Sequence, residues 1–129
     1  MIAYRLQGAD GVGPWRSGSY SSYMNNPDWE RISERCGDGH HQSPAFDGQS
    51  ISMSEYQDYV CACSSIEQFW HWFEDDWLNL PLEMYEICVP DDCVVIRNSQ
   101  VLINMAPATK RQVTVSEYCR LSKELDLMV

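Results

Sequence analysis

The sequence predicts a single α+β domain, residues 1–129, with a mainly antiparallel sheet and two or three helices. Three observations lead to this prediction. The chain has 129 residues, a length that suits one domain rather than two. Its second half holds short apolar segments separated by turn residues, which is typical of an antiparallel sheet. A helix-like segment at residues 66–77, rich in aromatic residues, precedes most of these strands.

The first half of the chain predicts one strand and one short helix. Residues 2–6 alternate apolar and polar side chains, as a half-buried strand does. The helix is expected to begin at Asn26-Pro27-Asp28, because Asn caps a helix, Pro suits its first position and Asp complements its dipole. Gly37 is expected to end it. The glycine-rich segment 8–18 and residues 37–50 are interpreted as loops.

The long aromatic helix is the clearest element in the chain. Ser64 with Glu67, and Ser65 with Gln68, form two overlapping capping boxes at its start. The helix is expected to run through Trp77, with Trp72 off its apolar stripe. Residues spaced three and four apart on one side of a helix face the core. The expected stripe consists of Ile66, Phe69, Trp70, Phe73 and Trp77.

The strands of the second half follow one another closely, and a short strand at residues 56–63 precedes the aromatic helix. Turn residues at 90–92 and 98–99 separate the segments. Ser116 is expected to cap a final helix that carries Tyr118, Leu121, Leu125 and Met128. The expected strands of this half are 84–89, 93–96, 101–105 and 111–115.

The charge balance excludes several classes of function. Nineteen acidic residues and nine Lys and Arg give a formal net charge of −10. A nucleic-acid binder needs cationic groups to displace counterions from phosphates, so direct nucleic-acid binding is not expected. Attraction to an anionic membrane is equally disfavoured. No apolar run approaches the roughly 18 residues of a membrane span, and the start of the chain does not resemble a signal peptide.

Six cysteines are expected to be free thiols, because nothing in the sequence predicts export to an oxidising compartment. Their spacing does not give the compact ligand pairs of a structural zinc site, so no metal site is predicted. The neighbouring His40 and His41 fall in the second loop, and the sequence assigns them no role.

The sequence contains no hydrolase, zinc-protease or phosphate-loop motif, which favours a binding protein over an enzyme and predicts no cofactor. One alternative stays open. Arg5 on the first strand, Ser65 at a strand-to-helix junction and Gln100 before a late strand resemble the order of key positions in ADP-ribosyltransferases. That resemblance implies NAD as a cofactor, with an early Arg binding NAD, a middle Ser shaping the nicotinamide pocket and a late Glu promoting transfer. Gln100 departs from the family because an amide carries no charge.

Short motifs between residues 4 and 101 suggest the origin of the chain. They are Tyr4-Arg5, Gly11-Val12-Gly13-Pro14-Trp15, Ser43-Pro44 with Asp47, Ser65-Ile66-Glu67-Gln68, Trp72-Phe73, Tyr85, Val89-Pro90 and Gln100-Val101. In their order, the chain resembles small, mostly uncharacterised accessory proteins of tailed bacteriophages. The resemblance implies a phage product that acts in the cytoplasm of the host bacterium.

Small, acidic phage proteins without a catalytic motif resemble anti-CRISPR and other anti-defence inhibitors. Defence nucleases hold nucleic acid in channels lined by Lys and Arg, and long-range attraction steers an acidic protein toward such a channel. The expected partner is therefore a host defence protein with a basic nucleic-acid-binding surface. A second alternative is a structural or morphogenetic phage protein whose acidic surface serves solubility. The candidate binding residues are Glu74, Asp75, Asp76, Asp91 and Asp92.

Overall fold

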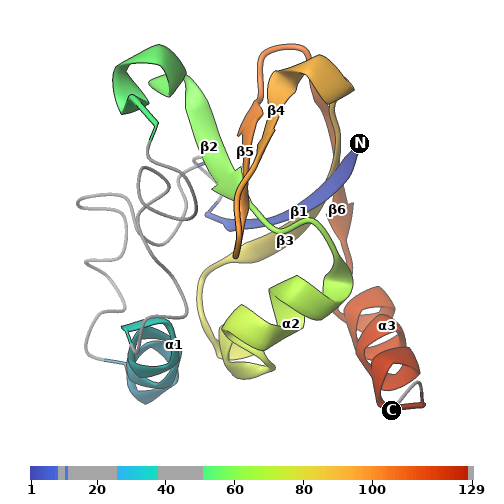
Figure 1. Ribbon diagram of the computed structural model, residues 1–129. Coiled ribbons are helices and arrows are strands. Elements are labelled where there is room, and N and C mark those ends of the chain that lie inside the picture. The colour runs from blue at the N-terminus through green and yellow to red at the C-terminus, as the bar shows by residue number, and fades with distance from the viewer. Residues whose placement is uncertain (9–10, 12–25, 38–50, 128–129) are drawn as a thin grey trace.

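The computed structural model describes residues 1–8, 11, 26–37 and 51–127 (Figure 1). The strands of this part are β1 (Ile2–Gln7), β2 (Tyr59–Ala62), β3 (Glu83–Cys88), β4 (Val94–Ile96), β5 (Val101–Asn104) and β6 (Thr109–Val113). The α-helices are α1 (Pro27–Gly37), α2 (Ile66–Phe73) and α3 (Val115–Leu127), and the 3₁₀ turns are η1 (Met53–Tyr56), η2 (Asp76–Asn79) and η3 (Asp91–Cys93). The predicted loop residues Gly13, Trp15, His40, His41, Ser43, Pro44 and Asp47, and also Met128, lie outside the described residues.

The described strands form two antiparallel three-stranded sheets, in the orders β1-β3-β6 and β2-β5-β4. One bridge joins the sheets. The Tyr4 N–H donates to the Cys63 carbonyl and the Cys63 N–H donates to the Tyr4 carbonyl, both at 2.7 Å. The strands therefore follow one another in space as β4-β5-β2-β1-β3-β6, which confirms the predicted α+β class with an antiparallel sheet.

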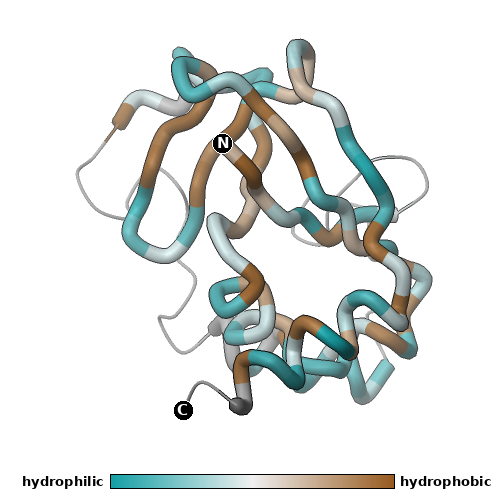
Figure 2. The backbone as a smooth tube through the Cα atoms, turned by 90° about the vertical axis from the view of Figure 1, so that its right-hand side faces the viewer, coloured by the Kyte–Doolittle hydropathy of each residue, from teal (hydrophilic) through white to brown (hydrophobic). Residues whose placement is uncertain are grey.

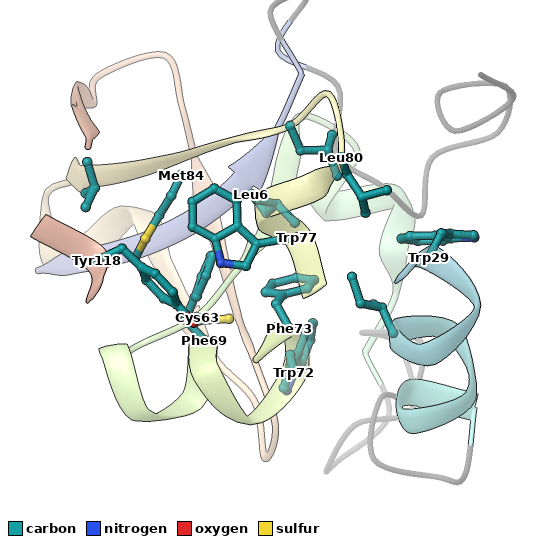
Figure 3. Close-up of a cluster of buried hydrophobic side chains, with 13 residues drawn as sticks. Leu6, Trp29, Cys63, Phe69, Trp72, Phe73, Trp77, Leu80, Met84 and Tyr118 are labelled. Atoms are coloured by element: carbon teal, nitrogen blue, oxygen red, sulfur yellow. The ribbon is translucent and has the colours of Figure 1, made fainter. Parts of the chain in front are cut away.

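Two hydrophobic clusters stabilise this arrangement. The smaller one lies between the two sheets and contains Ala3, Ala62, Ile87, Val89, Val101 and Ile103. The larger one lies between the β1-β3-β6 sheet and the three helices (Figures 1 and 3), and it contains every aromatic side chain that is buried in the described part of the chain. Figure 2 shows hydrophobic segments along the strands and hydrophilic turns between many of them. Side chains alternate along a strand, so one sheet supplies residues to both clusters.

The predicted burial of Phe69, Phe73 and Trp77 in one cluster is confirmed. The aromatic helix itself is shorter than predicted: α2 ends at Phe73, and Trp77 belongs to the separate turn η2. The stripe is also rotated. Trp72 is buried at 4% exposure, whereas Trp70 is 37% exposed, contrary to the prediction for both residues. The chain changes direction after Phe73, so helical spacing no longer applies to the residues beyond it.

The helix starts are set by local hydrogen bonds. The Asn26 side chain accepts from the Asp28 N–H at 2.8 Å, as the predicted cap of α1 requires. The Ser65 hydroxyl accepts from the Gln68 N–H at 3.0 Å at the start of α2. The prediction for α3 was wrong by two residues, because its cap is Thr114 and not Ser116. The Glu117 N–H donates to the Thr114 hydroxyl at 3.2 Å, and the Thr114 N–H donates to the Glu117 carboxylate at 3.4 Å.

Strand boundaries differ from the prediction by a few residues. The predicted strand 56–63 is split into the 3₁₀ turn η1 and the shorter strand β2. The last strand, predicted at 111–115, occupies Thr109–Val113. Four of its five residues are exposed, and only Val113 reaches the core. An edge strand of this kind carries little apolar signal, so pairing with β3 rather than hydrophobic pattern fixes its limits.

Candidate functional site

The predicted acidic binding residues occupy two separate places. Glu74, Asp75 and Asp76 form the connection between α2 and η2, on the helical side of the molecule. Asp91 and Asp92 lie in η3, beside the N-terminus and at the opposite end of the fold (Figure 1). The structure therefore does not bring the five carboxylates onto one surface. We name the first group the acidic turn.

The acidic turn is built on a strained residue. Glu74 has φ 45° and ψ −131°, a backbone conformation that residues other than glycine rarely adopt. Its N–H donates to the Trp70 carbonyl at 2.7 Å, and its own carbonyl accepts from the Tyr118 hydroxyl of α3. Such a conformation costs about 1–3 kcal/mol and persists only where its surroundings hold it in place. Contacts from two different helices hold it here.

Tyr118 reaches the turn from the core. Its side chain is fully buried, and its ring contacts those of Trp77 and Phe69 at centroid distances of 5.1 and 5.9 Å (Figure 3). The hydroxyl donates to the Glu74 carbonyl. Burial, the largest cause, raises the pKa of Tyr118 well above its ordinary value of 10.0. The hydroxyl therefore remains a hydrogen-bond donor throughout the neutral range.

Helix α1 holds the other end of the turn. Arg31 donates through Nε to the Asp76 carboxylate at 3.1 Å and through a terminal nitrogen to Asp28. The hydrogen bond with Asp76 is the largest cause that raises the pKa of Arg31. Asp76 is only 17% exposed, so it is a structural partner of Arg31 more than a free surface charge.

The same helix adds carboxylates that the sequence analysis missed. Glu30 and Glu34 are exposed, four residues apart on the side of α1 that faces away from the buried Trp29. The sequence signal that could have identified Glu30 and Glu34 is their position on the side of this short helix opposite its apolar residues. Helix α1 contacts η2, and Arg31 links Asp28 of α1 to Asp76 of the turn. We define the acidic surface as Asp28, Glu30, Glu34, Glu74, Asp75 and Asp76.

The second acidic group is supported differently. The Met1 amino group donates to the Asp91 carboxylate at 2.9 Å and to the Val89 carbonyl at 2.7 Å. The Asp91 side chain is 92% exposed, and its hydrogen bond with the amino group lowers its pKa below the ordinary value of 3.8. Asp92 is exposed and lies beside the thiol of Cys93. Burial first, and then the Asp92 charge, raises the pKa of that thiol.

The structure brings the three segments of the ADP-ribosyltransferase-like order close together. Arg5 donates to the Cys61 carbonyl at 2.6 Å and, through Nε, to Gln7 at 3.0 Å, which connects β1 to β2. Ser65 follows β2 as the cap of α2. Gln100 immediately precedes β5, the strand that pairs with β2. This proximity of three segments distant in sequence is a property of the fold alone.

The side chains of Arg5 and Gln100, however, point to opposite faces. Tyr4 bridges to Cys63, so these two side chains share one face of the sheet. Val101 pairs with Ala62, so Gln100, one residue earlier, lies opposite Cys63. Its side chain is therefore on the same face of the sheet as that of Cys63. Arg5 follows Tyr4 and lies on the other face. Gln100 is also 0% exposed, so an NAD site that uses both side chains is not assembled.

The described residues contain little that would hold a metal ion. Cys61, Cys63, Cys88, Cys93 and Cys119 are free thiols, while the side chain of Cys36 is outside the description. Within the described part of the chain, no three His, Cys, Asp or Glu side chains are grouped so that they could bind a metal. Among the helices described, none has the length and apolar character needed to cross a membrane.

Comparison with known proteins decides the origin of the chain. Residues 1–116 match the model of a family described as Bacteriophage T4 Y00F protein. The chain belongs to this family. No curated protein and no solved structure matches it.

Membership of the Bacteriophage T4 Y00F protein family confirms the phage origin that the short motifs suggested. The matched residues include β1 to β6, the acidic surface and both groups of candidate binding residues. They also include Arg5, Ser65 and Gln100. Tyr118 and most of α3 lie beyond residue 116, so the family match covers the acidic turn without the residue that holds it.

Proposed function

We propose that this phage protein is an inhibitor that binds a host defence complex in the bacterial cytoplasm, and that its partner is a CRISPR effector. The acidic surface would occupy a basic nucleic-acid-binding surface of that complex. The observation that carries the proposal is the grouping of six carboxylates from α1 and the acidic turn, which are 40 or more residues apart in sequence. Positive potential in a nucleic-acid channel would attract such a surface over long range.

The rigidity of the turn supports a binding role. Arg31 and Tyr118 fix both ends of the acidic turn, so its backbone does not need to be ordered when a partner binds. Ordering flexible segments on association costs affinity, and a preformed surface avoids that cost. The net charge of −10 adds a favourable long-range field for association with a cationic partner.

An ADP-ribosyltransferase-like function is the second candidate. The proximity of the segments that carry Arg5, Ser65 and Gln100 favours it. The neutral, buried amide at Gln100 and its orientation away from Arg5 favour binding without transfer over an active enzyme. This candidate predicts that NAD binds the protein and that Arg5→Ala abolishes that binding, as measured by calorimetry.

The test of the first candidate is inhibition of purified CRISPR effectors by the purified protein. The informative variant reverses exposed members of the acidic surface, Glu30, Glu34 and Asp75, to Lys. Asp76 is kept, because a lysine at this position would face Arg31 and disturb the fold. Reversal of all of Glu74, Asp75 and Asp76 is unsuitable for the same reason.

A matched control reverses Glu55, Asp58 and Asp92 to Lys, three exposed residues away from the acidic surface. Each triple reversal changes the net charge by six, from −10 to −4, so total charge is the same in both variants. We expect the first variant to associate much more slowly and the control to stay close to the wild type. Association of the wild type should slow as salt rises, because the Debye length is about 8 Å at physiological ionic strength.

Three outcomes would overturn the proposal. Equal loss in both variants would show that only net charge matters and not the acidic surface. Inhibition that requires NAD and is lost in Arg5→Ala would favour the ADP-ribosyltransferase-like candidate. Failure of the wild type to inhibit or bind any effector in the panel would favour a structural or morphogenetic phage protein.

A further inference from the structure

The acidic turn depends on a residue far away in sequence. Tyr118 lies 44 positions after Glu74, and its hydroxyl donates to the Glu74 carbonyl. Among the described residues other than glycine, Glu74 is the one with a positive φ. The strained residue and the buried hydroxyl therefore meet at one hydrogen bond, directly beneath the exposed Asp75.

We propose that Tyr118 is a positioning residue for partner binding: its hydroxyl holds Glu74 in the left-handed conformation and thereby sets the direction in which Asp75 is presented. This inference rests on the proposed function, because the basic surface of the partner is what Asp75 would meet. The aromatic ring of Tyr118 fills the core, whereas the hydroxyl carries the positioning role.

The distinction between ring and hydroxyl follows from the contacts. The ring packs on Trp77 and Phe69, contacts that a phenylalanine could also make. Only the hydroxyl donates to the Glu74 carbonyl. Without the hydroxyl, Glu74 would lower its energy by relaxing to negative φ, because its side chain clashes with the backbone at positive φ. That rotation would turn the next residue, Asp75, away from its present direction.

The proposal can be tested by a double-mutant cycle of Tyr118→Phe and Glu74→Gly. Glycine adopts positive φ without strain, so Glu74→Gly removes the reason for the turn to relax. Tyr118→Phe should therefore matter in the wild-type background and matter little in the Glu74→Gly background. Tyr85→Phe is the matched control, because it also removes a hydrogen-bonded hydroxyl, one that donates to Glu83 at 2.5 Å on β3.

Two measurements follow the cycle. The first is hydrogen exchange of the backbone amides of residues 75–79 in the protein alone, which reports whether the turn is held. The second is binding to an octalysine peptide at low salt, which serves as a defined cationic probe, and to any CRISPR effector that the protein inhibits. From the strength of one hydrogen bond, we expect Tyr118→Phe to accelerate exchange and to weaken binding about fivefold.

In the Glu74→Gly background, Tyr118→Phe should change binding by less than about twofold. If the two substitutions acted independently, Tyr118→Phe would have the same effect in both backgrounds. An equal loss of binding in both backgrounds would overturn the positioning role and assign Tyr118 to stability only. Unchanged exchange and binding in Tyr118→Phe would also overturn it. Failure of the wild type to bind octalysine or any effector would reject the proposed function, whereas the exchange data would still decide whether the hydroxyl holds the turn.

Discussion

Glu74–Asp76 and Asp91–Asp92 are both short runs of carboxylates beside a 3₁₀ turn, and in the sequence they look alike. In the structure, the first run is fixed by Arg31 of α1, Tyr118 of α3 and the aromatic cluster below it. The second lies on an exposed turn, and the N-terminal amino group pairs with its first carboxylate. Two similar acidic runs thus differ in the structure: the first is held by α1, α3 and the core, and the second is an exposed turn beside the N-terminal amino group.

The largest expected effect comes from removing the core beneath the acidic turn. Phe73 is 3% exposed and packs against Phe69 at a centroid distance of 4.8 Å. Phe73→Ala should lower the free energy of unfolding by about 3–5 kcal/mol, through lost burial and the cavity that remains. Urea denaturation measures this. Ile96→Ala, at a side chain that is 75% exposed on the other side of the fold, should stay within about 0.5 kcal/mol of the wild type.

A smaller effect is expected from the hydroxyl of Tyr118. Tyr118→Phe removes a part-buried hydrogen bond to the Glu74 carbonyl, and we expect a loss of about 1–2 kcal/mol in the free energy of unfolding. Tyr85→Phe removes a hydroxyl bonded to a glutamate on the sheet, and it should cost less than about 0.5 kcal/mol. Equal melting temperatures for the two variants would remove the distinction between a supported turn and an ordinary surface contact.

The start of α3, which carries Tyr118, has its own pH dependence. The hydrogen bond from Arg111 is the largest cause that lowers the pKa of Glu117 below 4.5. The folded state thus prefers the ionised carboxylate. This stabilisation is complete above the unfolded pKa, near 4.5, and is lost as the pH falls through the lower folded pKa.

Arg111→Gln should raise the pKa of Glu117 and shift acid unfolding to higher pH. Carboxyl chemical shifts followed by NMR over pH 2–6 would measure both effects. Arg120→Gln is the graded control, because the charge of Arg120 is the last of the causes that lower the same pKa. A Glu117 pKa that does not respond to Arg111→Gln would contradict the capping role of this ion pair.

The smallest effect is expected at the second acidic turn. The Met1 amino group lowers the pKa of Asp91 below 3.8, so its contribution is present above that pH and disappears as the pH falls further. Asp91→Asn should therefore leave stability at neutral pH almost unchanged, because the Asp91 side chain is highly exposed. A loss comparable to that of Tyr118→Phe would show that the two turns are equally well supported.

Local sequence signals determined the starts of α1 and α2 and the fold class. Asn26 and Ser65 accept hydrogen bonds from N–H groups no more than three residues away, so these helix starts can be predicted without knowledge of the tertiary structure. Alternation predicted the first strand, and closely spaced strands predicted the antiparallel sheet. The composition alone gave the net charge of −10 and with it the proposed class of partner.

Tertiary structure decided the end of α2 and the nature of the site. Helical periodicity continues to Trp77, but α2 ends before Glu74, which has a positive φ and accepts a hydrogen bond from the Tyr118 hydroxyl, 44 residues away. The buried side of α2 also differs from the predicted stripe, with Trp72 inside and Trp70 partly exposed. Helical spacing assigns side chains to a face only while the backbone remains helical, so it cannot place the residues that follow a break in the helix.

The grouping of charges and candidate residues was likewise a tertiary property. Arg31 joins α1 to Asp76 across 45 residues, and strand pairing brings Arg5 near the segment before Ser65 while turning Gln100 to the other face. Sequence order gives the identity of these residues but not the register of strands or the docking of helices. Those depend on hydrogen bonds and buried contacts between distant segments, which form only when the whole chain folds.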